Sequence, residues 1–160
     1  MTRSVPADAR FEPEFVAGLK HVFEEKIAFN KVMGVKLSVI EPARVAGYIE
    51  MRPELVGHFV HKQLHGGVIS ACLDALGGIA VLAAIGARHL DEPLEQRLHR
   101  FVKLGTIDLR IDYLRPAISE RFELRAEVLR LGSRVATTRM EFFAADGKLL
   151  ATGAGAYIVS

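Results

Sequence analysis

The chain has 160 residues, of which 50% are hydrophobic, and its charged residues leave a formal net charge of +2. This length and apolar content fit one domain with its own core, so we expect a single domain over residues 1–160. The small net charge and the absence of a basic run argue against nucleic-acid binding, and the single cysteine, Cys72, excludes a disulfide framework or a cysteine-rich metal site within the chain.

The N-terminal third combines a helical pattern with two extended ones. The opening residues, MTRSVPADAR, lack the apolar stretch of a secretion signal, which favours a cytoplasmic protein. Apolar residues recur at helical spacing over residues 11–27 and predict an amphipathic helix that ends near Asn30. Two strand-like runs follow at residues 35–40 and 45–51, separated by a turn at Pro42.

The central segment, residues 64–85, reads LHGGVISACLDALGGIAVLAAI and predicts a long apolar helix with one charge, Asp74. Its length approaches that of a membrane span. A carboxylate in the middle of the run and two glycine pairs argue against that interpretation, as do the alternating segments that follow. We therefore expect the buried core helix of a protein that does not enter the membrane.

A polar link over residues 86–105 leads to four further strand candidates, at residues 106–114, 122–129, 134–143 and 149–159. The first of these is two-faced, with Ile107, Leu109, Ile111 and Tyr113 predicted on a core face and Thr106, Asp108, Arg110 and Asp112 on a polar face. Short connections favour antiparallel pairing. The expected fold class is therefore α+β, an antiparallel sheet of about six strands curled round one long helix.

Two sequence stretches carry a resemblance to a known family. HGGVISACLD, at the start of the central helix, and GTIDLRIDYLRP, in the strand after the link, resemble the hotdog-fold acyl-CoA thioesterases of the PaaI type, and among them the YigI-like branch. The likeness runs from about Phe11 to the C-terminus. It implies a hotdog fold, a homodimer or dimer of dimers, and hydrolysis of an acyl-CoA with no metal and no cofactor beyond the CoA of the substrate.

The helix start and Asp74 are the first candidates for chemistry. Backbone N–H groups at Gly66 and Gly67 open the helix without helical partners, and the helix dipole there favours a negative charge such as a thioester oxyanion. The resemblance implies that Gly66 is one oxyanion donor and that Asp74 is the general base or nucleophile. The alternatives are a glycine pair that only allows close packing and an aspartate that only forms a structural hydrogen bond.

Three further residues are candidates for the site. Related thioesterases place a serine or threonine at the position of Thr106, where it helps to hold the attacking water. His65 either orients the substrate or protonates the departing thiolate, or it only caps the helix start or anchors the turn. Relatives also have an asparagine before HGG; an alignment without a gap from Gly57 puts His58 in its place, with His61 and Gln63 as rivals.

The spacing of Gly66 and Asp74 predicts how the site is assembled. The two residues are eight positions apart, which is roughly 12 Å along a helix at 1.5 Å per residue. One carbonyl group is too small to contact both within one subunit. We therefore expect a composite site in a homodimer, with the glycine from one subunit and Asp74 from its partner.

The ligand-binding candidates are basic and aromatic. Arg110, Arg115 and Arg134, the last after the turn Gly132-Ser133, are candidates for the CoA phosphates. The link supplies Arg88, Arg97, Arg100 and Lys103, which we expect in a flap over the ligand or in a plain solvent-facing loop. Phenylalanines of the N-terminal helix and Phe59 predict an apolar pocket for a medium or long acyl chain. His58, Lys62 and His65 do not complete a metal site, since no carboxylate accompanies them.

Two alternative functions stay open at this point. The histidine-containing loop before an apolar helix with one acid also resembles the hotdog 3-hydroxyacyl dehydratases, although the loop lacks their proline and the acid is Asp74 rather than a glutamate. The other alternative is a non-catalytic acyl-CoA-binding module. About 34 residues ahead of the first strand are too few for a DNA-binding domain with its own core.

Overall fold

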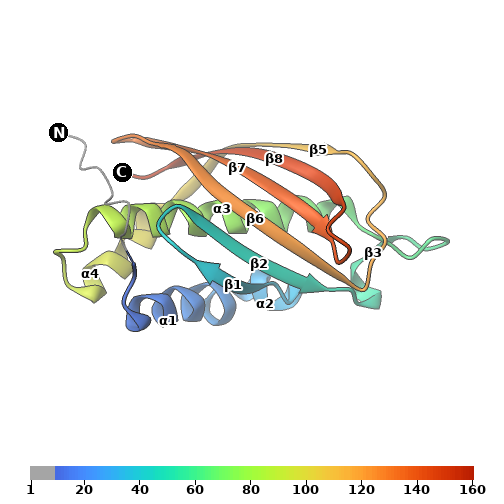
Figure 1. The fold of residues 1–160 in the computed structure, drawn as a ribbon, viewed down its shortest axis with the longest axis horizontal. Coiled ribbons are helices and arrows are strands. Elements are labelled where there is room, and N and C mark those ends of the chain that lie inside the picture. Colours follow the sequence, from blue (N-terminus) through green and yellow to red (C-terminus); the bar gives the residue numbers. More distant parts are fainter. Residues whose placement is uncertain (1–9) are drawn as a thin grey trace.

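The computed structural model describes residues 10–160, in which a six-stranded antiparallel sheet curls round the long helix α3 (Gly66–Arg88) (Figure 1). The strands are β1 (Lys36–Ile40), β2 (Arg44–Glu50), β5 (Gly105–Tyr113), β6 (Arg121–Leu131), β7 (Val135–Ala144) and β8 (Leu149–Ile158). They lie in the order β1-β2-β6-β7-β8-β5, so β1 and β5 form the two edges. This confirms the α+β class and the hotdog arrangement expected from the sequence.

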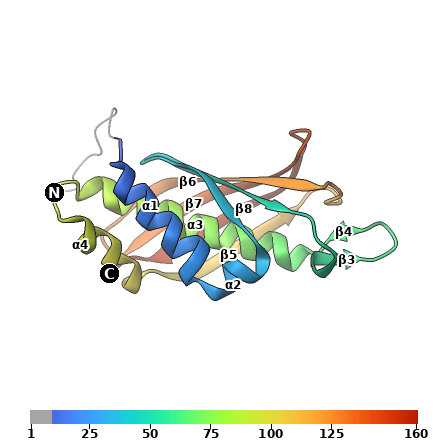
Figure 2. The same ribbon diagram turned by 90° about the horizontal axis from the view of Figure 1, so that it is seen from below.

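The face of α3 that the sheet leaves open is covered by short helices (Figure 2). These are α1 (Pro13–His21), the π-helix η1 (Val22–Lys26), α2 (Ala28–Met33), α4 (Leu94–His99) and the 3-10 helix η3 (Arg100–Lys103). The single N-terminal helix that the spacing predicts is thus divided into three. Ile27 has an extended conformation (φ −81°, ψ 101°) that interrupts the helix, and Gly34 ends the last piece in the left-handed region at φ 76°.

Helix α3 forms the centre of the core. It is long and apolar enough to cross a bilayer, but 67% of its most apolar window is buried inside the fold. Its apolar side chains pack on the inward residues of β2, β6, β7 and β8, which alternate along each strand as a half-buried sheet requires. The core-helix interpretation is therefore the one that the structure supports.

The strand predicted at residues 106–114 is present as β5, and its predicted faces hold from Asp108 to Asp112 but are wrong for Thr106 and Ile107. The pairing of β5 with β8 shifts at Ile107, because Thr106 opposes Tyr157 and Asp108 opposes Ala156. This β-bulge adds one residue to β5 and reverses the side-chain alternation at that point. Thr106 consequently lies on the face of β5 towards α3, where it stays exposed to solvent, and Ile107 is 57% exposed instead of buried.

A small hairpin at the start of α3 was not expected from the sequence. It consists of β3 (Val56–His58) and β4 (Gln63–Leu64), preceded by the 3-10 helix η2 (Pro53–Leu55), and it projects beyond the sheet (Figure 1). The short strands give little alternation to detect. Phe59 at its tip is 83% exposed.

The contact between Gly77 of α3 and Tyr157 of β8 gives a test of the core. A Cβ added at Gly77 would overlap the Tyr157 hydroxyl and lie 2.7 Å from Met140 Sδ. We expect Gly77→Ala to lower the free energy of unfolding by about 1–3 kcal/mol, as overpacking does, in urea titration. Gly78→Ala is the matched control, because its Cβ would meet nothing nearer than Leu104 at 3.5 Å. Equal stability of the two variants would contradict this account of the packing.

Candidate active site

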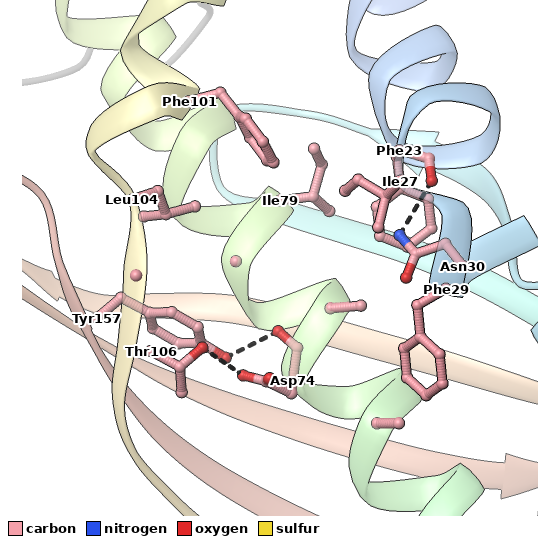
Figure 3. A pocket seen from close by; sticks show the side chains of 14 residues that line it. Phe23, Ile27, Phe29, Asn30, Asp74, Ile79, Phe101, Leu104, Thr106 and Tyr157 are labelled. Atoms are coloured by element: carbon pink, nitrogen blue, oxygen red, sulfur yellow. Dashed lines mark hydrogen bonds between the residues drawn. The ribbon is translucent and has the colours of Figure 1, made fainter.

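Asp74 faces a pocket because its neighbours on the same face of α3 are small. Ala71, Ala75 and Gly78 lie one turn away or next to it. The pocket has a volume of about 290 Å³, at the low end for ligand sites. It lies between α3, the η1–α2 segment and the stretch from η3 into β5, with Asp74 at one end (Figure 3).

Thr106 binds the Asp74 carboxylate directly. Its Oγ1 donates a hydrogen bond of 2.8 Å to Asp74 Oδ1 (Figure 3). The bulge at Ile107 makes this possible, since without it the threonine would point to the other face of the sheet. Asp74 is only half-buried. A carboxylate can accept about four hydrogen bonds, so it retains acceptor capacity for a water molecule in the pocket.

Tyr157 is a site residue that sequence reasoning missed. Its hydroxyl donates a 3.0 Å hydrogen bond to the backbone oxygen of Asp74. Burial, and next the charge of Asp74, raise the pKa of Tyr157 well above its usual value, so the hydroxyl stays protonated. The sequence did contain a signal, because Tyr157 is the one large residue in the otherwise small run 151–157. That change in size marks the place where β8 contacts α3.

The start of α3 presents one free backbone donor. His65 caps the helix, since its Nδ1 accepts the Gly67 N–H at 2.8 Å. That bond occupies Gly67, which the sequence had suggested as a second oxyanion donor. The Gly66 N–H donates no hydrogen bond within residues 10–160. The Gly66 carbonyl accepts the Tyr113 hydroxyl at 2.9 Å, which fixes this turn to β5.

The structure does not bring the free N–H and the carboxylate together in one chain. Helix α3 is continuous from Gly66 to Arg88, so Gly66 and Asp74 remain roughly 12 Å apart along the axis. Gly66 and His65 lie outside the pocket that Asp74 faces.

The residues proposed to replace the family's asparagine lie on the hairpin. His58 and His61 are exposed and their rings stack at 4.9 Å, away from the pocket around Asp74. The dehydratase alternative needs a histidine and an acid at one centre, and His58 and Asp74 do not meet in this chain. Phe59 likewise lies outside the pocket, whereas Phe23 and Phe29 of the N-terminal helices line it.

The arginines expected at the CoA phosphates are spread along the sheet, with Arg110 in the middle of β5, Arg115 just beyond its end and Arg134 in the β6–β7 turn. Arg115 follows the end of β5 and donates to the Leu149 oxygen at 2.9 Å, and Arg110 pairs with Asp112 at 3.1 Å. Gly132, Ser133 and Arg134 form the β6–β7 turn beside the start of β5. Strand β5 has nine residues, so roughly 30 Å separates Arg115 from this turn. Within one chain, Arg115 and Arg134 therefore cannot bind the same phosphate group.

The basic link is not a basic flap. Arg97 is 3% exposed, forms an ion pair with Glu12 and stacks on Phe15 at 4.6 Å from the ring centre. Arg100 binds Glu92 and lowers the pKa of that carboxyl. Arg88 donates to the Leu131 oxygen at 2.7 Å, and Lys103 alone of the four stays exposed and unpaired in the described chain.

The link instead supplies apolar walls, because Phe101 and Leu104 line the pocket opposite Phe23 and Ile27 (Figure 3).

Cys72 is not a candidate nucleophile, since burial raises its pKa to about 12. No group of three histidine, cysteine or acidic residues suited to a metal ion occurs within the described residues.

Comparisons with known proteins agree with one another. The family model described as thioesterase superfamily matches residues 61–151. The medium/long-chain acyl-CoA thioesterase YigI of Salmonella typhimurium is 36% identical over 141 residues, which cover 86% of this chain and 89% of that protein. The protein of the same name from Escherichia coli K12 is 35% identical with the same coverage. A crystal structure from Shewanella oneidensis, described as related to the thioesterase superfamily, has a TM-score of 0.86 and 35% identity, covering 94% of this chain and 100% of that one.

Proposed function

The chain belongs to the thioesterase superfamily, and from that premise we propose that it hydrolyses medium- or long-chain acyl-CoA to a free acid and CoA. The observation that supports this most strongly is the Asp74–Thr106 pair at the end of an otherwise mainly apolar pocket. A carboxylate held by a hydroxyl suits the activation of water, and the apolar walls suit an acyl chain. The similar YigI proteins carry that activity in their names.

The proposed reaction uses residues that this sequence supplies, contributed by two copies of the chain. Asp74 takes a proton from water as the water oxygen bonds to the thioester carbon, and Thr106 helps to position that water. The Gly66 N–H donates to the oxyanion that forms. The C–S bond then breaks, the carbonyl re-forms, and the CoA thiolate takes the proton that Asp74 holds, directly or through solvent, which returns Asp74 to the carboxylate; His65 stays the cap of the helix, with its Nδ1 accepting the Gly67 N–H. In an alternative form of the scheme, the Asp74 carboxylate itself attacks the thioester carbon and expels the CoA thiolate. Water then hydrolyses the resulting anhydride between Asp74 and the acyl group.

We place the site between two subunits, with Gly66 from one and Asp74 from the other. The 12 Å separation within one helix supports this, as does the free Gly66 N–H. Strand β5 is an edge of the sheet and carries exposed Ile107 and Tyr113, which suits pairing with a second copy. In such a dimer Arg110, Arg115 and Arg134 are our candidates for the CoA phosphates.

The apolar pocket predicts how activity depends on chain length. Each buried methylene contributes about 0.8 kcal/mol, so kcat/KM is expected to rise about fourfold per added methylene until the pocket is full. The measurement is thiol release from saturated acyl-CoAs of increasing length. Highest activity with acetyl-CoA would contradict the proposed substrate class, and no release from any of them would contradict the thioesterase proposal itself.

A further inference from the structure

The pocket contains one buried polar side chain that the proposed reaction does not use. Asn30 of α2 is 2% exposed and lines the pocket between Phe23 and Phe29. Its Nδ2 donates a 2.9 Å hydrogen bond to the Phe23 backbone oxygen. The other half of the amide, Oδ1, lies on the pocket side of the side chain (Figure 3).

The break in the N-terminal helix fixes the orientation of this amide. In a regular α-helix the Phe23 oxygen would accept the Ile27 N–H, but that N–H binds Val22 O instead, at 3.1 Å. The Phe23 oxygen is therefore available to Asn30. A flipped amide would set Oδ1 against this carbonyl, acceptor against acceptor, so the nitrogen must face Phe23 and the oxygen must face the pocket.

Asn30 Oδ1 accepts no hydrogen bond from residues 10–160. Only two other residues that line the pocket have a side-chain donor, Thr106 and Tyr157, and both of their hydroxyls donate to Asp74. The oxygen is reached from the pocket, and it becomes a buried acceptor without a partner, which is unfavourable, only when the pocket is filled by a group that offers no donor. A water molecule can supply the missing donor in the empty pocket, but an acyl chain that displaces this water leaves the oxygen unpaired.

We propose that the pocket selects acyl chains that carry a hydroxyl group, whose O–H donates to Asn30 Oδ1. This rests on the thioesterase function proposed above and defines its substrate class further. A hydroxyl is neutral and brings a donor, whereas a keto group or carboxylate would oppose its lone pairs to Oδ1. An ammonium group would have to be buried without a countercharge near Asn30.

The test compares acyl-CoAs of equal length with and without a hydroxyl, placed in turn at carbon 2, carbon 3 and positions further along the chain. We expect kcat/KM to favour the hydroxylated ester about tenfold at one position, the factor that one hydrogen bond supplies. The methyl ether at that same position, which keeps the oxygen and loses the donor, is expected to lose the preference. This comparison needs no variant protein.

A variant assigns the preference to Asn30. In Asn30→Leu, which has nearly the same size and no acceptor, the hydroxyl-to-plain ratio is expected to fall to one or below. Phe29→Leu, which alters the adjacent wall, keeps the ratio above one. The proposal is overturned if the wild-type ratio is near one at every position, or if Asn30→Leu leaves it unchanged. Hydrolysis of plain chains without this preference refutes this inference alone, whereas no thiol release from any ester refutes the thioesterase function as well.

Discussion

Asp74→Asn is expected to lower kcat for acyl-CoA hydrolysis by about 10²- to 10⁴-fold, the range that a positioned general base contributes. Asparagine has nearly the same shape and can still accept the Thr106 hydrogen bond through its oxygen. It cannot take a proton from water or form an acyl anhydride. The measurement is steady-state thiol release with the acyl-CoA that the wild-type protein hydrolyses best.

Two comparisons make this result specific. Asp112→Asn changes the same residue type at an exposed position of β5, and it is expected to leave kcat within twofold of wild type. The unfolding midpoint of Asp74→Asn shows whether the fold is kept. A folded Asp74→Asn protein with wild-type kcat would remove Asp74 from the reaction.

Gly66→Pro is expected to reduce kcat by about 10²- to 10³-fold, the loss seen when one oxyanion donor is removed. Proline deletes the backbone N–H, which in Gly66 has no partner within residues 10–160. The first position of a helix tolerates proline. His65, the residue before it, already has the extended conformation that a following proline requires, φ −64° and ψ 133°.

Gly66→Ala is the matched control, because it adds a Cβ 3.2 Å from the Tyr113 ring but keeps the N–H. We expect a much smaller loss of kcat for this variant than for Gly66→Pro. A similar loss of kcat in both variants would mean that the added carbon atoms beside Tyr113, and not the missing N–H, cause the loss.

The two inactive variants together test the composite site. If Gly66 and Asp74 act from different subunits, dissociating and re-forming an equal mixture of Asp74→Asn and Gly66→Pro dimers gives heterodimers with one intact site each. Random pairing then restores about a quarter of wild-type activity. If both residues act within one chain, every site in the mixture lacks one of them, and no activity returns.

The sequence predicted the elements because their patterns are local. The long apolar run around Asp74 predicted α3. Extended, alternating patterns predicted the six strands of the sheet to within a few residues of their observed ends. The resemblance carried by HGGVISACLD and GTIDLRIDYLRP correctly named the family. These features depend on neighbouring residues, which a single sequence displays directly.

The misses depend on contacts between distant residues. The face of Thr106 is set by a bulge in its pairing with β8, which its own alternation cannot reveal. Arg97 is buried because Glu12 and Phe15 lie against it from another helix. Asn30 looked like the end of a helix, whereas its role in the pocket arises from the interruption at Ile27.

The division of the N-terminal helix has a consequence for how this protein can change. Asp74 and Thr106, to which we assign the reaction, lie on α3 and β5, whereas the far walls of the pocket come from η1, α2 and η3, which lie outside the sheet. If the pocket holds the acyl chain as proposed, substitutions at positions such as Ile27 or Phe101 are expected to alter which acyl chain fits without moving Asp74 or Thr106. On this assignment the residues that set the substrate range differ from those that carry out the chemical step, so selection or engineering can change the substrate range while the chemical step is kept.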